Sequence, residues 1–228
     1  MSPILKTEQL CRNYKVGKNT ISVLKDIEVT VEAGEFVSIM GPSGCGKSTL
    51  LYLLGGIDTP TSGKVFLHNE DINTMNDKKK SMIRRQSIGF VFQFYNLVQN
   101  LTVEENIMLP VTMDGKKVKD YQSALKETLD IVGLTERRTF TPRELSGGQQ
   151  QRVAIARAVI LNPTLILADE PVGNLDSKSG EDIMGLFKKI NEEKGITIVQ
   201  VTHSEEYANI GKRMIQMKDG VIEADYKL

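Results

Sequence analysis

The chain has 228 residues, of which 40% are hydrophobic, and 29 basic side chains (Lys and Arg) balance 29 acidic ones (Asp and Glu). Such a composition suits a globular protein with a sizeable core, and a net charge of zero gives no global attraction to nucleic acid or to an anionic membrane. Only two cysteines occur, Cys11 and Cys45, which indicates a reducing compartment. The N-terminus lacks the layout of a signal peptide, and the longest apolar run, near residues 50–56, is too short to span a bilayer.

The first predicted elements are strands. An alternating stretch with Ile27, Val29 and Val31 on one face turns at Ala33-Gly34 and continues as the apolar run "EFVSIM". Alternation is typical of a half-buried strand, whereas a continuous apolar run is typical of a strand buried in a parallel sheet. We therefore expect an antiparallel ribbon that leads into a core strand.

A phosphate-binding loop follows directly. The stretch "GPSGCGKST" fits the pattern G-x-x-x-x-G-K-[ST] and precedes an apolar helical segment. Its backbone N–H groups and the positive helix end would cradle phosphates, Lys47 would reach the β- and γ-phosphates, and the Ser48 hydroxyl would bind Mg²⁺. A chance match in a glycine-rich turn is the alternative. The predicted nucleotide-binding residues are Gly41, Pro42, Ser43, Gly44, Cys45, Gly46, Lys47, Ser48 and Thr49.

The remaining strands and helices alternate along the chain. Apolar, β-rich runs follow at residues 65–68, 88–92, 165–168 and 196–201, with helical patterns between several of them. This order is typical of an α/β domain with helices flanking a sheet. Residues 94–161 lack such runs and contain helix starts, including a capping box from Thr102 to Glu105, so we expect an inserted helical subdomain there. Near the C-terminus, two short strands flank Asp219-Gly220, a pair that suits a hairpin turn.

Polar residues follow three of the predicted strands. The run "LILADE" ends in two carboxylates, of which Asp169 could bind Mg²⁺ and Glu170 could accept a proton from an attacking water. The alternative is that both residues only cap the next turn. His203 and Gln93 also lie at strand ends, where ligands of open α/β sheets collect. Either alone would usually be structural, but together with the other motifs we assign both to catalysis and Gln93 also to the metal.

A second helix start has the features of a phosphate site. Ser146 and Gln149 form the pattern S-x-x-Q of a capping box, and Gly147 and Gly148 leave its N–H groups open. Glycine in a helical turn costs about 0.5 to 1 kcal/mol relative to alanine, which suggests a functional reason. The helix should end before Asn162-Pro163. An ordinary glycine-tolerant cap is the alternative.

Together, these motifs resemble the ordered set of ABC transporter ATPase subunits: "GPSGCGKST", Gln93, "LSGGQ" at 145–149, "LILADE", "NLD" at 174–176 and "TH" at 202–203. The resemblance covers essentially the whole chain. It implies an α/β fold with a P-loop NTPase (RecA-like) core sheet, an N-terminal antiparallel β ribbon and an inserted helical subdomain. Residues 1–228 would form a single ABC ATPase domain, with 1–93 and 162–228 as the nucleotide-binding core and β subdomain, and 94–161 as the helical subdomain carrying the LSGGQ signature.

The same resemblance implies hydrolysis of ATP with Mg²⁺ by two copies that close head to tail. The helix end of one copy, from Ser146 to Gln149, would bind the γ-phosphate held by Lys47 of the other. Asp176 would lie at the seam between the copies. Tyr14 would stack on adenine, with a structural role for this lone tyrosine as the alternative.

Finer details, "FQFYNLVQNLTVEENIMLP" and "ADEPVGNLDSKSG", are similar to the subclass of macrolide exporters, lipoprotein-release systems, bacitracin-type peptide resistance transporters and the cell-division pair acting on wall hydrolases. Val172 departs from the usual Thr and lacks its hydroxyl. The subclass implies a membrane-spanning permease subunit as partner and a cytoplasmic chain, peripheral at the cytoplasmic face of the cell membrane. The segment with Phe94, Tyr95, Leu97 and Leu101 would receive the permease's coupling helix; burial in the helical subdomain is the other interpretation.

Two alternative functions remain open. The chain could be an ATP-driven regulatory or signalling partner of a membrane protein, or a soluble ABC ATPase of DNA repair or translation. The short interval between Gln93 and the LSGGQ motif and the single phosphate loop weaken the second of these. No nucleic acid partner is expected: the basic run at residues 77–85 is interpreted as a solvated helix face, and Met214 and Met217 as core residues.

Overall fold

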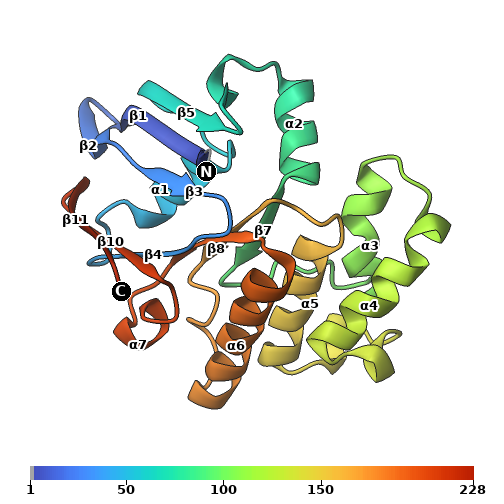
Figure 1. Ribbon diagram of the computed structural model, residues 1–228. Helices are drawn as coiled ribbons and strands as arrows, with labels where there is room; N and C mark the ends of the chain where they lie inside the picture. Colours follow the sequence, from blue (N-terminus) through green and yellow to red (C-terminus); the bar gives the residue numbers. More distant parts are fainter. Residues whose placement is uncertain (1–2) are drawn as a thin grey trace.

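The computed structural model describes residues 3–228 and contains two β-sheets (Figure 1). The first sheet is antiparallel and has the strand order β2-β1-β5-β6, with β3 pairing with β1. Its strands are β1 (Pro3–Val16), β2 (Asn19–Ile27), β3 (Thr30–Glu32), β5 (Ser62–Leu67) and β6 (Glu70–Asp71). The predicted ribbon is confirmed. The strand predicted at 65–68 starts earlier and ends at Leu67, because His68 and Asn69 form a turn with positive φ angles of 51° and 63°.

The second sheet has six strands in the order β11-β10-β4-β9-β8-β7. They are β4 (Phe36–Met40), β7 (Ile88–Phe92), β8 (Leu165–Asp169), β9 (Thr197–Val201), β10 (Arg213–Lys218) and β11 (Val221–Lys227). All neighbours are parallel except β10 and β11, which form the hairpin predicted around Asp219-Gly220. Since parallel strands end at one edge of the sheet, this order gathers the segments that follow β4, β7, β8 and β9.

Seven α-helices and four 3₁₀ turns complete the described part of the chain. The helices are α1 (Lys47–Leu54), α2 (Asp77–Gln86), α3 (Val103–Met113), α4 (Gln122–Val132), α5 (Gly147–Val159), α6 (Ser177–Lys194) and α7 (Glu205–Ala208); the 3₁₀ turns are Ile72–Thr74, Val118–Tyr121, Thr135–Arg137 and Pro142–Glu144. Figure 1 shows α3 and α4 in green beyond α5, on the side away from the antiparallel sheet. No strand interrupts residues 94–161, all of which the structure describes.

Two hydrophobic cores cover the two faces of the parallel sheet. Strand β8 illustrates the division: Leu165 and Leu167 belong to one core, and Ile166 and Ala168 belong to the other. Successive side chains of a strand point to opposite faces, so a continuous apolar run serves both. One core contains α1 and the antiparallel sheet, and the other contains α3, α4, α5 and α6. The helices of residues 94–161 thus share their core with the sheet, and the boundaries of a separate subdomain stay a prediction.

Burial bears on three interpretations of minor features. Helix α2 has no buried residue, which supports a solvated face for its basic run. Met214 and Met217 are buried, as predicted. The segment after Gln93 is divided: Leu97 belongs to the core, whereas Phe94 is 73% exposed. None of the described helices is both long and apolar enough to cross a membrane.

Candidate nucleotide-binding site

The phosphate loop connects β4 to α1 and depends on glycines at defined positions. Gly44 and Gly46 have φ angles of 81° and 102°, which side chains rarely adopt. A Cβ atom on Gly46 would lie 2.7 Å from the Leu24 side chain, while one on Gly44 would point into open space. Gly46 is also the N-cap of α1, and no described side chain caps this helix. The first N–H groups of α1 therefore remain available to the oxygens of a phosphate.

Lys47 turns its ammonium back into the loop. Its Nζ donates to the carbonyl oxygens of Gly41 at 2.7 Å and Pro42 at 3.0 Å, and the residue is 6% exposed. The predicted residues Gly41 to Thr49 thus form a loop, residues 41–46, and the first turn of α1, with the Lys47 ammonium folded back onto the loop. Cys45 is buried and, like Cys11, carries a free thiol.

Hydroxyl and carboxylate oxygens meet beside this loop. Ser48 Oγ donates to Asp169 Oδ1 at 2.8 Å, and the Tyr52 hydroxyl donates to Asp169 Oδ2 at 2.8 Å. Ser48 and Tyr52 lie four residues apart on α1, so both face the end of β8. Oxygen ligands of this kind suit Mg²⁺, so the residues fit the metal that the sequence predicts. Burial, followed by the hydrogen bond to Asp169 and the charge of that carboxylate, raises the pKa of Tyr52 to about 12, which keeps its hydroxyl a donor.

Glu170 adopts an uncommon backbone conformation at the edge of the sheet. Its φ angle is 44°, and its N–H donates to the Val201 carbonyl at 3.0 Å. One carboxylate oxygen, Oε2, lies 3.3 Å from Nδ1 of His203, whose side chain is 64% exposed. Glu170 also lines a pocket of about 240 Å³ together with Ser43, Lys47 and other residues of the phosphate loop. Backbone strain of this kind concentrates at functional sites.

Gln93 has a partner that sequence reasoning missed. Its Nε2 donates to Asn174 Oδ1 at 3.2 Å, and its backbone carbonyl oxygen accepts from Asn174 Nδ2 at 3.0 Å. A Cβ atom on Gly173 would lie 2.9 Å from Gln93 and 3.3 Å from Glu170, so glycine lets both side chains approach. The structure thus brings Ser48 and Asp169 together but pairs Gln93 with Asn174. A metal or catalytic role for Gln93 stays a prediction.

Tyr14 lies on β1 in contact with charged residues. Its hydroxyl donates to Asp58 Oδ2 at 2.7 Å, and the Arg12 guanidinium lies 4.4 Å from its ring centre. Arg12 also forms a 2.7 Å ion pair with Asp58. This arrangement gives Tyr14 a structural role, as the alternative interpretation held, and covers one face of its ring. Stacking of adenine on the other face stays a prediction.

The second helix end is capped as predicted but has a further reason for its glycines. Ser146 and Gln149 form both hydrogen bonds of the capping box at the start of α5. A Cβ atom on Gly147 would lie 2.8 Å from the Tyr95 hydroxyl oxygen, and one on Gly148 would lie 3.1 Å from Ser179 Oγ. Close packing inside the chain therefore favours these glycines whether or not a phosphate binds. None of the residues that line the Glu170 pocket comes from this helix end.

Asp176 caps the helix beside this end. It accepts hydrogen bonds from the backbone N–H of Ser179 at 3.0 Å and from Ser179 Oγ at 2.6 Å. The Ser179 side chain first and its backbone N–H second lower the pKa of Asp176 below its usual range. Asp176 thus has a role within one chain as the N-cap of α6. Its place at a seam between two copies stays a prediction.

Two buried or half-buried polar side chains near the site carried no recognisable motif. Gln151 Nε2 donates to the Pro171 carbonyl at 2.5 Å and so links α5 to the loop after Glu170. Arg157 donates to the carbonyl oxygens of Tyr95 at 2.9 Å and Asn96 at 2.6 Å. Both are long-range contacts that no local pattern indicates.

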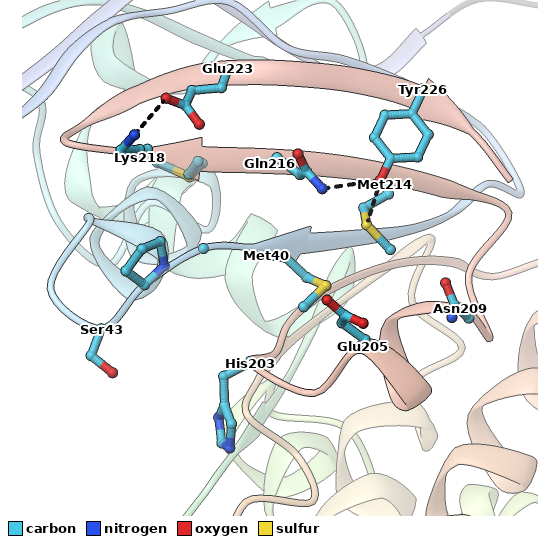
Figure 2. Close-up of a pocket in the computed structure, with 13 residues that line it drawn as sticks. Met40, Ser43, His203, Glu205, Asn209, Met214, Gln216, Lys218, Glu223 and Tyr226 are labelled. Atoms are coloured by element: carbon cyan, nitrogen blue, oxygen red, sulfur yellow. Dashed lines mark hydrogen bonds and ion pairs between the residues drawn. The ribbon is translucent and has the colours of Figure 1, made fainter.

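Two hollows adjoin these elements. One, of about 660 Å³, is lined by Gly41, Pro42 and Ser43 of the phosphate loop, by β10, β11 and α7, and by His203. Figure 2 shows Met40 and Met214 in this hollow and the Lys218–Glu223 ion pair on the hairpin above it. The other hollow, here called the β7 groove, has a volume of about 400 Å³ and lies between β7, α2, α3 and α5. Its lining includes Phe90, Phe92, Pro110, Met113, Arg84 and Arg157.

Comparison with known proteins identifies the relatives of this chain. Residues 24–173 match the family model described as ABC transporter. The uncharacterized ABC transporter ATP-binding protein MJ0796 of Methanocaldococcus jannaschii is 46% identical, with 99% of this chain and 97% of that protein aligned. The lipoprotein-releasing system ATP-binding protein LolD of Geobacter metallireducens is 44% identical, with 99% and 100% aligned. The chain is also 44% identical to the macrolide export ATP-binding/permease protein MacB of Chlorobium phaeobacteroides, of which it spans 34%.

One solved structure of MJ0796 is described as the dimeric structure of a post-hydrolysis state bound to ADP and Pi. It superposes with a TM-score of 0.90 and covers 98% of both chains. At 46% sequence identity, this likeness extends beyond the fold to the sequence itself. The predicted P-loop fold, with its antiparallel ribbon and parallel sheet, is therefore confirmed.

Proposed function

The chain belongs to the ATP-binding subunits of ABC transporters and is an ATPase, and on that premise we propose that two copies close head to tail around two ATP molecules and drive separate permease subunits. One observation carries the proposal. The helix end at Ser146–Gln149 is capped and partly exposed, yet the pocket at Lys47 and Glu170 contains no residue from it. A second copy would bring this end to the nucleotide, and the relative MJ0796 forms a dimer in its solved structure.

Each residue of the site has a proposed role in binding ATP. The N–H groups at the start of α1 and the ammonium of Lys47 would bind the phosphates, and Tyr14 would contact adenine. Ser48, Asp169 and Gln93 would hold Mg²⁺, which when bound supplies charge stabilisation to the phosphate oxygens. The helix end of the second copy, Ser146 to Gln149, would add N–H donors at the γ-phosphate, with Asp176 at the seam.

Hydrolysis needs a base for the attacking water. Glu170 would accept the proton from this water as its oxygen bonds to the γ-phosphorus and the bond to the ADP oxygen breaks. His203 Nδ1 lies 3.3 Å from the Glu170 carboxylate, close enough to orient it. The Gln93–Asn174 pair stands next to Glu170 and would help to position the water.

The β7 groove is the proposed contact with the permease. Its walls combine the aromatic rings of Phe90 and Phe92 with arginine side chains. The exposed Met113 also lines the groove, and the exposed Phe94 lies two residues after Phe92 in the chain. An apolar groove edged by cations fits an amphipathic segment that carries a carboxylate. Binding there would hold the chain at the cytoplasmic face of the membrane. The similarity to LolD and MacB supports lipoprotein release or export as the process. Antimicrobial-peptide resistance, which the sequence motifs also suggested, stays a prediction.

The decisive experiment is the mass in solution of Glu170→Gln with and without Mg-ATP. This variant should bind ATP but hydrolyse it about 10² to 10⁴ times more slowly, so that a dimer persists. We expect ATP to double the mass, and the added change Ser146→Arg to abolish the doubling. Asn76→Arg, which removes the cap of α2 instead, is the matched control and should leave the dimer intact.

Two results would contradict the proposal. If Ser146→Arg leaves the doubling unchanged, the helix end does not take part in a shared site. If ATP never changes the mass of Glu170→Gln, this chain does not form the dimer by itself.

For the permease contact, Phe94→Asp should reduce recovery of the chain with membranes, whereas Val16→Asp, at an exposed valine on β1, should not.

A further inference from the structure

We propose that Tyr52 is a positioning residue of the ATPase site, whose hydroxyl holds the Asp169 carboxylate in the orientation that lets Asp169 and Ser48 bind Mg²⁺ together. This inference rests on the metal-binding role proposed above for Asp169. It assigns to Tyr52 a role that no part of the phosphate-loop motif includes, because Tyr52 lies three residues beyond the end of that motif.

The two oxygens of Asp169 have different partners. The Tyr52 hydroxyl donates to Oδ2 and Ser48 Oγ donates to Oδ1, each at 2.8 Å. Asp169 is 9% exposed. Removal of the Tyr52 hydroxyl would leave a nearly buried carboxylate oxygen without this donor, which favours rotation of the carboxylate away from Ser48. Partners that orient a metal ligand in this way usually matter for metal affinity.

The Tyr52 ring is itself held between α1 and the edge of the sheet. Its centre lies 6.5 Å from that of Phe92 with an angle of 57° between the rings, and Phe92 stacks on Phe90 at 5.7 Å and 9°. Phe92 pairs with Asp169 in the register of β7 and β8, so strand pairing places Phe92 beside the carboxylate. Contact with Phe92 therefore limits the directions in which the Tyr52 hydroxyl can point.

The same rings continue to the β7 groove. Phe90 and Phe92 line that groove, while Tyr52 contacts Phe92 on one side and Asp169 on the other. A short series of contacts thus runs from the wall of the groove to the metal-binding carboxylate. Tyr52 is the residue in this series that carries a polar group, and its hydroxyl is the atom that acts on the site.

The test compares Tyr52→Phe, which removes only the hydroxyl, with the parent protein in the Glu170→Gln background. ATP binding is titrated against Mg²⁺, and again against Mn²⁺, with a parallel titration in EDTA. We expect the metal concentration at half-saturation to rise about tenfold, at the lower end of the range for such partners, with metal-free ATP affinity unchanged. Tyr121→Phe, on a 3₁₀ turn far from β8 in the chain, is the matched control and should change neither quantity.

Asp169→Asn in the same assay separates the possible outcomes. If Asp169→Asn raises the metal requirement and Tyr52→Phe does not, the hydroxyl has no positioning role. If Tyr52→Phe weakens metal-free ATP binding as much as binding with metal, the hydroxyl supports the loop and the proposal is wrong. If Asp169→Asn itself leaves the metal requirement unchanged, the proposed metal role of Asp169 fails, and the inference fails with it.

Discussion

Helices α1 and α5 both have glycines at their N-termini beside a candidate phosphate site, but these N-termini differ. Helix α1 has Gly46 as its N-cap, in a loop of positive φ angles, without a side-chain cap. Helix α5 has Ser146 as its N-cap, with a complete capping box. Charged side chains lie near the start of α1, namely Lys47, Asp169 and Glu170. At the start of α5, by contrast, no residue takes part in any of the described ion pairs.

This difference suggests two separate tasks: one helix end holds the triphosphate, and the other completes the set of donors around it. At α1, a cation, a carboxylate and free N–H groups converge within one chain, so that end can hold a triphosphate unaided. At α5, the side chain of Ser146 already accepts one N–H group, and Gly147 and Gly148 are partly exposed. Such an end would add donors to an anion that is already held elsewhere. Under the proposed head-to-tail dimer, the start of α1 would hold the nucleotide and the start of α5 in the second copy would add the remaining donors.

The largest expected effect comes from a change at the first end. Lys47→Ala removes the cation from the phosphate loop, and we expect ATP hydrolysis to fall about 10² to 10³-fold, as for loss of one group that stabilises developing charge. ATP binding by dilute, monomeric protein should weaken as well. Ser146→Ala should leave that monomeric binding unchanged. Equilibrium ATP binding and turnover assays measure both effects, with Lys189→Ala, at an exposed lysine, as the control. Equal losses of monomeric ATP binding in Lys47→Ala and Ser146→Ala would contradict the different roles proposed for the two helix ends.

An intermediate effect should distinguish packing from phosphate access at the second end. Gly147→Ala would bring a methyl group to 2.8 Å from the Tyr95 hydroxyl oxygen. We expect a lower thermal midpoint and weaker ATP-dependent dimerisation. Adding Tyr95→Phe removes that oxygen and should restore the thermal midpoint. If dimerisation returns as well, the glycine serves packing alone; if it stays weak, the methyl group blocks the partner's nucleotide. If Gly147→Ala alone leaves the thermal midpoint unchanged, the close contact between the new methyl group and the Tyr95 hydroxyl is relieved at little cost in stability.

The smallest effect is a dependence of stability on pH at Asp176. Hydrogen bonds from Ser179 lower the pKa of Asp176 in the folded protein. The stabilisation is therefore present above the unfolded pKa, about 3.9, and is lost as the pH falls through the lower folded pKa. Asp176→Asn keeps a capping side chain without the charge. We expect the wild type to have the higher thermal midpoint at pH 7 and the difference to shrink in acid; a difference that grows in acid would contradict this sign.

Local patterns account for the parts of the site that sequence reasoning found. The phosphate loop, the capping box at Ser146 and the strand at residues 88–92 all depend on neighbours within a few positions, and the structure confirms them. The parallel sheet then explains why Glu170 and His203 meet: Glu170 follows β8, His203 follows β9, and both strands end at the same edge. This convergence could be predicted because the rule for parallel strands is general.

The contacts that were missed join distant parts of the chain. Tyr52 and Asp169 are 117 residues apart, and Gln93 and Asn174 are 81 apart. Nothing near Tyr52 in the sequence distinguishes it from the apolar residues of α1 among which it lies. The glycine pair at 147–148 was predicted correctly as a helix start, but the reason found in the structure, contact with Tyr95 and Ser179, required the fold.

The sequence by itself determined the α/β class of fold, the phosphate-binding loop and the helix caps, and its resemblance to a known family supplied the set of catalytic motifs. The fold class, the loop and the caps depend on side-chain periodicity and on hydrogen bonds between residues a few positions apart, so local sequence patterns are enough to predict them. Only the tertiary structure decided which side chains donate hydrogen bonds to Asp169, which residue Gln93 contacts, and which part of the segment after Gln93 is buried. Those contacts depend on the packing of α1, β7 and α5 against one sheet, where distances of a few ångströms select among residues that are alike in the sequence.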